Sequence, residues 1–210
     1  METNWAAQNL ETIRTLMERS ALYRRALAPI STFVGGVGII AAVVGRLLKL
    51  ENLSYFSLYW MLVGVFALAG SLLLVRRQAS RHGEKFWSPP TRRVAQAMAP
   101  ALLVGLIVGL TTLATASTSD SEEIAEPVVL IWTVLYGLAL HSAGFFMPRG
   151  IRLLGWGFLG EGLLLFIHFL ITQSSGTNIS SHFFMGVIFG ATHLACGIYL
   201  YFTEPRKSAA

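Results

Sequence analysis

The sequence predicts an all-α, polytopic integral membrane protein with six transmembrane helices and an amphipathic N-terminal helix on the cytoplasmic side. The chain of 210 residues is 54% hydrophobic and only 13% charged, whereas a soluble domain carries about 25% charged residues. Fourteen of the sixteen Lys and Arg residues fall on alternate sides of six apolar segments; Arg46 and Lys49 are the exceptions. Each segment is long enough to cross ~30 Å of hydrocarbon. The six segments run over 29–48, 54–75, 94–115, 127–147, 151–172 and 182–203.

Residues 1–28 are expected to form a helix that lies along the membrane surface. Apolar side chains such as Trp5 and Leu16 recur on one face at 100° per residue, while Arg14 and Glu18 lie on the other. Basic residues directly before a spanning segment favour an interfacial anchor on lipid headgroups. A helix that binds a partner is the alternative. No cleavable signal sequence is predicted, because charges interrupt the apolar residues of this region.

The spanning domain is predicted over 29–203, followed by a short tail over 204–210. Pro29 suits the first turn of a helix. The second segment carries aromatic residues at its outer end, where such side chains favour the headgroup level. The third and fourth segments are separated by an acidic link without Lys or Arg, the fourth and fifth by a tight turn at 148–150, and the last two by an uncharged link.

The distribution of positive charge predicts the orientation. Four basic residues precede the first segment, six lie within 76–93, two follow the fourth segment and two follow the sixth, against two on the other side. Lys and Arg are retained in cytoplasmic loops, so both termini are expected in the cytoplasm, with the chain in a bacterial inner membrane. The same rule explains the net charge of +5 without nucleic acid. A cytoplasmic protein or membrane subunit is a candidate partner for 1–28 and 76–93, beside the lipid bilayer.

Four titratable residues are expected at membrane depth, where each is costly and invites a functional explanation. They are the candidates for a proton relay or ligand site: Glu161, His193, His141 and His168. With a rise of ~1.5 Å per residue, Glu161 and His193 fall near the midplane of consecutive antiparallel helices. They could therefore share a proton or an ion pair. The alternative is a polar clamp that only holds helices together.

Pairs of small residues predict close helix packing. Gly105 and Gly109 form one GxxxG pair, and Gly186 and Gly190 form another. A formal GxGxxG match over 155–160 lies inside an apolar span with no preceding strand, so we interpret it as packing and not as a dinucleotide site.

No cofactor is required by the sequence, although it is compatible with two types of site. His193 and Cys196 lie three residues apart on one helix and are weak candidates for a metal. His141 and His193, with His168 as a further candidate, could ligate haem. Ser142 and His193 faintly suggest an intramembrane serine protease, but the surrounding LHSAGFF is not a GxSG motif.

These observations lead to one functional expectation and two alternatives. The short loops leave no room for a soluble catalytic domain, which favours a small, non-enzymatic structural, regulatory or sensory membrane subunit. The first alternative is a proton-coupled transporter or channel that uses Glu161 and His193. The second is a haem or metal redox protein.

Overall fold

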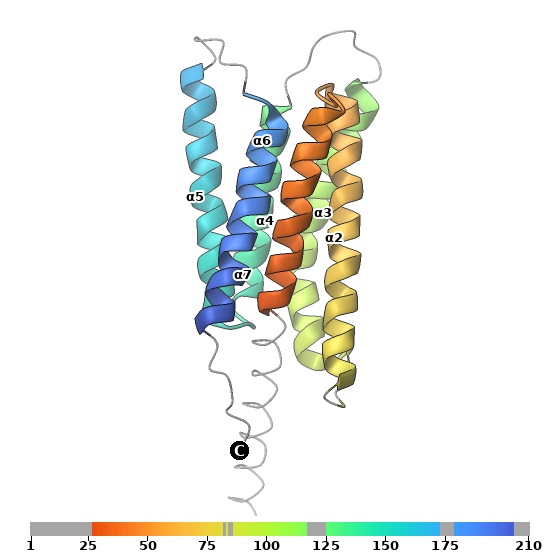
Figure 1. The fold of residues 1–210 in the computed structure, drawn as a ribbon, viewed down its shortest axis with the longest axis vertical. Helices are drawn as coiled ribbons and strands as arrows, with labels where there is room; N and C mark the ends of the chain where they lie inside the picture. Colours follow the sequence, from red (N-terminus) through yellow and green to blue (C-terminus); the bar gives the residue numbers. More distant parts are fainter. Residues whose placement is uncertain (1–26, 82, 84–85, 117–124, 173–178, 204–210) are drawn as a thin grey trace, which may run out of the picture.

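The computed structural model describes residues 27–81, 83, 86–116, 125–172 and 179–203 and shows an all-α bundle (Figure 1). All six of the predicted spanning helices are present in these residues, and each is long and apolar enough to cross a membrane. This confirms the all-α class and the six candidate membrane spans. The amphipathic helix expected over 1–28 lies outside the described residues except for its last two, and the tail over 204–210 lies outside them altogether.

The helices run nearly parallel to one another along the long axis of the molecule. The first helix spans Leu27–Leu47 and carries no label in the figures. The next four are α2 (Leu53–Arg81), α3 (Pro89–Ala116), α4 (Glu126–Ala143) and α5 (Arg149–Thr172). The last helix has three parts, which are α6 (Ser181–Met185), a π-helical turn η1 (Gly186–Ala191) and α7 (Thr192–Thr203).

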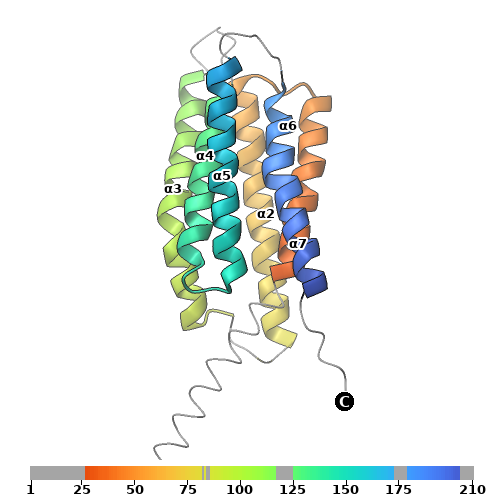
Figure 2. The same cartoon turned by 90° about the vertical axis from the view of Figure 1, so that its left-hand side faces the viewer.

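Helices that follow one another in the chain are neighbours in space, and the last helix returns to the first (Figures 1 and 2). The first helix meets α2 where the Tyr59 hydroxyl donates to the carbonyl of Ala41 at 2.7 Å. The last helix meets α5 where the rings of His168 and Phe184 lie 5.2 Å apart. The described helices thus form a closed ring, and the buried core draws side chains from the first helix, α2, α4, α5 and the last helix.

Glycine brings the first and last helices unusually close. A Cβ atom added to Gly38 would lie 2.9 Å from the Cα of Gly190, and one added to Gly190 would lie 2.7 Å from the side chain of Ile39. Gly186, one turn earlier in the last helix, lies against the Cβ of Ala42. Small residues permit this backbone approach, which strengthens van der Waals packing in a lipid environment.

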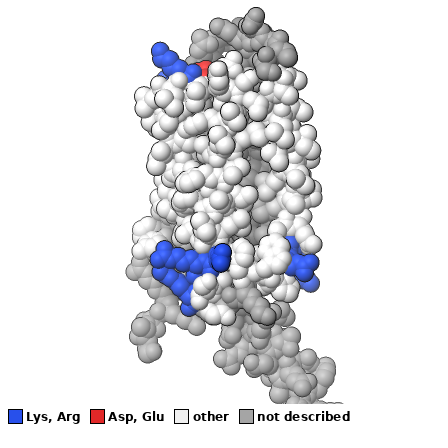
Figure 3. All heavy atoms as spheres, turned by 90° about the vertical axis from the view of Figure 1, so that its right-hand side faces the viewer, with Lys and Arg blue, Asp and Glu red and all other residues white. Residues whose placement is uncertain are grey.

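A wide apolar band surrounds the bundle. On the face drawn in Figure 3, Lys and Arg side chains gather near the two ends, and no charged side chain interrupts the surface between them. Exposed large apolar side chains cover this band, including Leu62 and Phe66 on α2 and Leu103 and Ile107 on α3. Soluble monomers rarely expose a continuous apolar surface of this extent, whereas such a surface suits contact with lipid.

Helix ends differ from the ends of the apolar segments. α2 continues through Arg76 to Arg81, and α3 already begins at Pro89, so both helices extend beyond the hydrocarbon-like stretch. The fourth helix was expected to continue through the apolar stretch to 147, which is wrong, because α4 ends at Ala143. A Cβ atom on Gly144 would lie 2.6 Å from that of Arg152, so the chain turns into α5 at a residue without a side chain.

The last helix is not a uniform α-helix. The backbone N–H of Thr192 donates to the carbonyl of Val187, five residues earlier, as in a π-helix. One extra residue in this turn means that α6 and α7 do not share a single α-helical register. The turn lies directly before two polar residues, Thr192 and His193, and changes the direction in which both side chains point.

Candidate functional site

His193 is enclosed by partners from three directions. Only 3% of the residue is exposed, and its Nε2 lies 2.9 Å from the Tyr136 hydroxyl of α4. Its Nδ1 lies 2.7 Å from the carbonyl of Phe189, and the Phe158 ring of α5 packs beside it, with ring centroids 5.1 Å apart. A carbonyl can only accept a hydrogen bond, so Nδ1 carries a proton. In the neutral ring, Nε2 then accepts from Tyr136.

Glu161 of α5 is bound to the residue next to His193. The Thr192 hydroxyl donates to its Oε1, while its Oε2 is buried without a hydrogen-bond partner. Within the described part of the chain, no hydrogen bond or ion pair joins Glu161 to His193. Similar depth made this pairing plausible, but consecutive residues of a helix point about 100° apart. Thr192 consequently points toward Glu161 of α5, while His193 points toward Tyr136 of α4 and packs on the Phe158 ring.

The two remaining candidates lie among aromatic rings. His141 of α4 makes edge-to-face contacts with Trp156 at 5.2 Å and Phe145 at 5.4 Å between centroids, and its Nδ1 is buried without a hydrogen-bond partner. His168 of α5 packs on Phe184, and its Nε2 is likewise buried and unpartnered. Each buried donor or acceptor without a partner costs free energy. The contacts that surround these two rings are with aromatic side chains.

The glycine candidates lie at helix contacts. Trp132 of α4 packs against α3, where its Cδ1 would be 3.7 Å from a Cβ on Gly105 and its Cζ2 3.0 Å from a Cβ on Gly109. The Trp132 indole also donates to the carbonyl of Gly105 at 2.9 Å. In the GxGxxG match of α5, a Cβ on Gly155 would lie 2.5 Å from the backbone nitrogen of His141, whereas the other two glycines face open space.

A fourth histidine, which was not among the predicted site residues, is the most buried of the histidines that the structure describes. His182 lies in the first turn of the last helix and has an exposed fraction of 0%. The Trp60 indole of α2 donates to its Nδ1 at 3.0 Å, and its Nε2 lies 3.0 Å from the carbonyl of Leu50. His182 lies at the end of an apolar segment, whereas the predicted candidates were the titratable residues expected at membrane depth. The aromatic residues predicted at the same end of α2 were the available signal that a polar ring could be enclosed there.

The described polar side chains form no three-ligand metal cluster, and His193 has no unpaired ring nitrogen for a haem iron. Among the residues that the structure describes, no three His, Cys, Asp or Glu side chains gather closely enough to hold a metal ion. Cys196 is partly buried with a free thiol. Both ring nitrogens of His193 already bond to Tyr136 and Phe189, so neither offers a free lone pair to iron or zinc. Ligation would require both bonds of this closed arrangement to be rebuilt.

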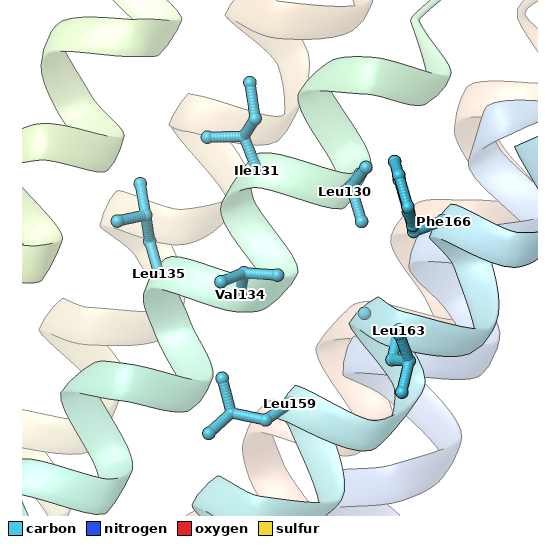
Figure 4. A pocket seen from close by; sticks show the side chains of 8 residues that line it. Leu130, Ile131, Val134, Leu135, Leu159, Leu163 and Phe166 are labelled. Atoms are coloured by element: carbon cyan, nitrogen blue, oxygen red, sulfur yellow. The ribbon is translucent and has the colours of Figure 1, made fainter.

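An open groove runs along the outside of the bundle between α4 and α5 (Figure 4). Its volume is about 460 Å³ and its lining is entirely apolar. The lining side chains include Leu130 and Val134 from α4 and Leu159 and Phe166 from α5. The groove does not include Glu161 or any of the buried histidines, so it offers them no path to a ligand.

Six apolar helices of spanning length, and a face on which no charged side chain lies between the two ends (Figure 3), indicate a multi-pass membrane protein. Comparison with known proteins found no matching family model, no similar curated protein and no similar solved structure. The class of the protein therefore follows from its own sequence and geometry.

Proposed function

We propose that this chain is a non-enzymatic structural, regulatory or sensory membrane subunit whose buried polar side chains act as clamps between helices. The observation that carries the proposal is the environment of His193, in which both ring nitrogens bond to protein groups. A relay or ligand site needs a group that can exchange a proton or accept a ligand. A clamp needs satisfied partners, and His193 has them.

The hydrogen bonds between helices follow a common pattern that supports this proposal. Tyr136 to His193 joins α4 to α7, Thr192 to Glu161 joins α7 to α5, and the Trp132 indole joins α4 to α3. Polar contacts of this kind contribute about 0.6 kcal/mol each on average within membranes and reach about 1.7 kcal/mol. Together they fix the rotation of four helices whose outer faces are uniformly apolar.

One observation favours a second candidate function, a proton-coupled transporter or channel. The Oε2 of Glu161 is buried without a partner, and a carboxyl group held at membrane depth by one hydroxyl is costly. Such residues commonly serve proton or ion pathways. The π-helical turn before Thr192 adds to this, because π-bulges are frequent at functional sites.

Replacing Glu161 by Gln separates the two functions. The Gln carbonyl can still accept from the Thr192 hydroxyl, so a clamp should keep its thermal midpoint within a few degrees of the original (~1 kcal/mol or less). The control is Thr192→Val, which removes the donor and should lower the midpoint. Proton flux is measured in parallel with a pH-sensitive dye in proteoliposomes. Flux in the original chain that Glu161→Gln abolishes would overturn the clamp and favour the transporter.

A further inference from the structure

At the end of the bundle that holds Arg46 and Lys49, one imidazole ring contacts three neighbouring parts of the chain. His182 receives the Trp60 indole N–H at Nδ1 and contacts the Leu50 carbonyl through Nε2, each at 3.0 Å. A Cβ atom added to Gly45 would lie 2.5 Å from Nδ1, so the ring lies directly against the backbone of the first helix. His182 therefore joins the last helix to the first helix, to the link that follows it and to α2.

The two hydrogen bonds allow only one form of the ring. A carbonyl only accepts and an indole N–H only donates, so Nε2 must carry the proton and Nδ1 must be bare. This is the neutral imidazole. We propose that His182 is a pH-sensitive latch, closed when the ring is neutral and opened when a proton from the adjacent aqueous phase binds Nδ1. In the protonated ring both nitrogens are donors, so Nδ1–H and the Trp60 N–H oppose each other.

The groups around the latch come from every element packed against it. The link contributes Glu51, which accepts a 2.8 Å hydrogen bond from Ser180 and acts electrostatically on His182. α2 contributes Tyr59, whose ring meets the imidazole edge-on at 5.9 Å while its hydroxyl is bound to Ala41. The first helix and the link supply the exposed Arg46 and Lys49, and α4 begins at the same end with Glu126.

Opening the latch has a local and specific consequence. The start of the last helix loses its bond to α2, while Nε2–H can still donate to the Leu50 carbonyl and Ser180 still donates to Glu51 of the link. The clamps at His193 and Glu161 lie beyond the π-helical turn and do not depend on His182. The latch at His182 therefore does not depend on the proposed function, and an experiment that disproves the clamps would not disprove it. With the orientation predicted from the positive charges, the latch faces away from the cytoplasm.

Nuclear magnetic resonance of the full chain in lipid nanodiscs tests the latch. The indole nitrogens of the five tryptophans are labelled with ¹⁵N, and spectra are recorded from about pH 8 to about pH 5, where histidine titrates. Trp60→Phe and Trp132→Phe assign the two signals needed. The Trp60 indole signal should shift or broaden on acidification. The Trp132 indole donates to the Gly105 carbonyl, has no titratable partner and should stay in place.

His182→Gln is the decisive variant. A Gln amide can accept from Trp60 and donate to Leu50 without titrating in this range, so the pH response of the Trp60 signal should vanish. If this variant does not fold, the histidine ¹⁵N shifts of the original chain give the same information. They should report an Nε2–H ring that becomes doubly protonated over the pH range in which the Trp60 signal moves. A Trp60 signal that is insensitive to pH, a response that persists in His182→Gln, or an equal shift of Trp132 would overturn the latch.

Discussion

At the scale of single residues, the two most buried histidines satisfy their nitrogens with different partners. His193 accepts from a hydroxyl and donates to a carbonyl of its own helix, whereas His182 accepts from an indole and donates to a carbonyl of a preceding link. Both therefore avoid an unpaired polar atom in a dry environment, which would cost about 1–3 kcal/mol. Glu161 differs because one of its oxygens has no such partner.

Removal of the Tyr136 hydroxyl oxygen should weaken the clamp at His193. Tyr136→Phe removes the hydroxyl that donates to Nε2 and leaves that buried nitrogen without a partner. We expect the free energy of unfolding to fall by about 1 kcal/mol, in the range of interhelical hydrogen bonds in membranes. Reversible unfolding in mixed detergent micelles measures the change. Tyr55→Phe, at an exposed tyrosine of α2, is the matched control and should be neutral; equal stability of the two variants would contradict the clamp.

The sequence indicated which titratable residues lie at membrane depth, but it did not indicate which side chains they contact. A count of residues along each helix gives depth, and depth correctly suggested that Glu161 and the start of α7 lie at a similar level. It contains no information on rotation about the helix axis, which decides whether Thr192 or His193 faces α5. His182 was missed for a related reason, because distance from the membrane centre does not reveal enclosure by Phe56, Tyr59 and Trp60.

At the scale of helices, one face of α5 packs and another does not. Gly155 lies so close to α4 that an added Cβ would be 2.5 Å from a backbone nitrogen, while Gly157 has nothing within 4 Å. The two glycines are two residues apart in one span and differ in what they face. Substitutions at Gly157 can therefore serve as controls for substitutions at Gly155.

Gly155→Ala should loosen the α4–α5 contact, while Gly157→Ala should not. Overpacking of a tight contact typically costs about 1–3 kcal/mol, and removing an exposed glycine from a helix stabilises it slightly. Thermal midpoints of both purified variants in the same detergent test this difference. Equal midpoints would show that the backbone approach of α4 and α5 is softer than the structure indicates.

Helix number was predictable from the sequence, whereas helix ends and irregularities were not. Apolar length reports where hydrocarbon would be crossed, so it identified six spans. It cannot report that α2 continues to Arg81, because the last turns of that helix are polar. It also cannot report that α4 stops at Ala143, because the residues that follow, such as Phe145 and Phe146, are still apolar. The π-helical turn has no sequence signature apart from the glycines at its positions 186 and 190.

At the scale of the whole molecule, charge separates the two ends. The ends of α2 and α3 carry Arg76, Arg77, Arg81, Arg92 and Arg93, while the opposite end carries Arg46 and Lys49. The positive-inside rule predicts that the arginine-rich end is cytoplasmic. The arrangement of six helices in a closed ring could not be predicted. All six segments are apolar, so their composition does not show which helices are neighbours.

Orientation can be measured with single cysteines. In a Cys196→Ser background, Ser88→Cys should be shielded from a membrane-impermeant maleimide in intact cells and react after lysis. Ser54→Cys, at the other end of α2, should react in intact cells. The reverse pattern would mean that the chain inserts the other way round, and the latch at His182 would then face the cytoplasm.

The ring closes only when its two ends meet, and this has a consequence for how the protein is made. The first helix leaves the ribosome long before the last one, with 133 residues between Leu47 and Ser181. At about 5–20 residues per second it therefore waits about 7 to 27 seconds. During that interval its glycine face, which belongs against Gly190, has only lipid or another protein to contact. A chain that stalls before residue 181 would present that face indefinitely, as a mark by which membrane proteases or insertion factors could recognise an unfinished molecule.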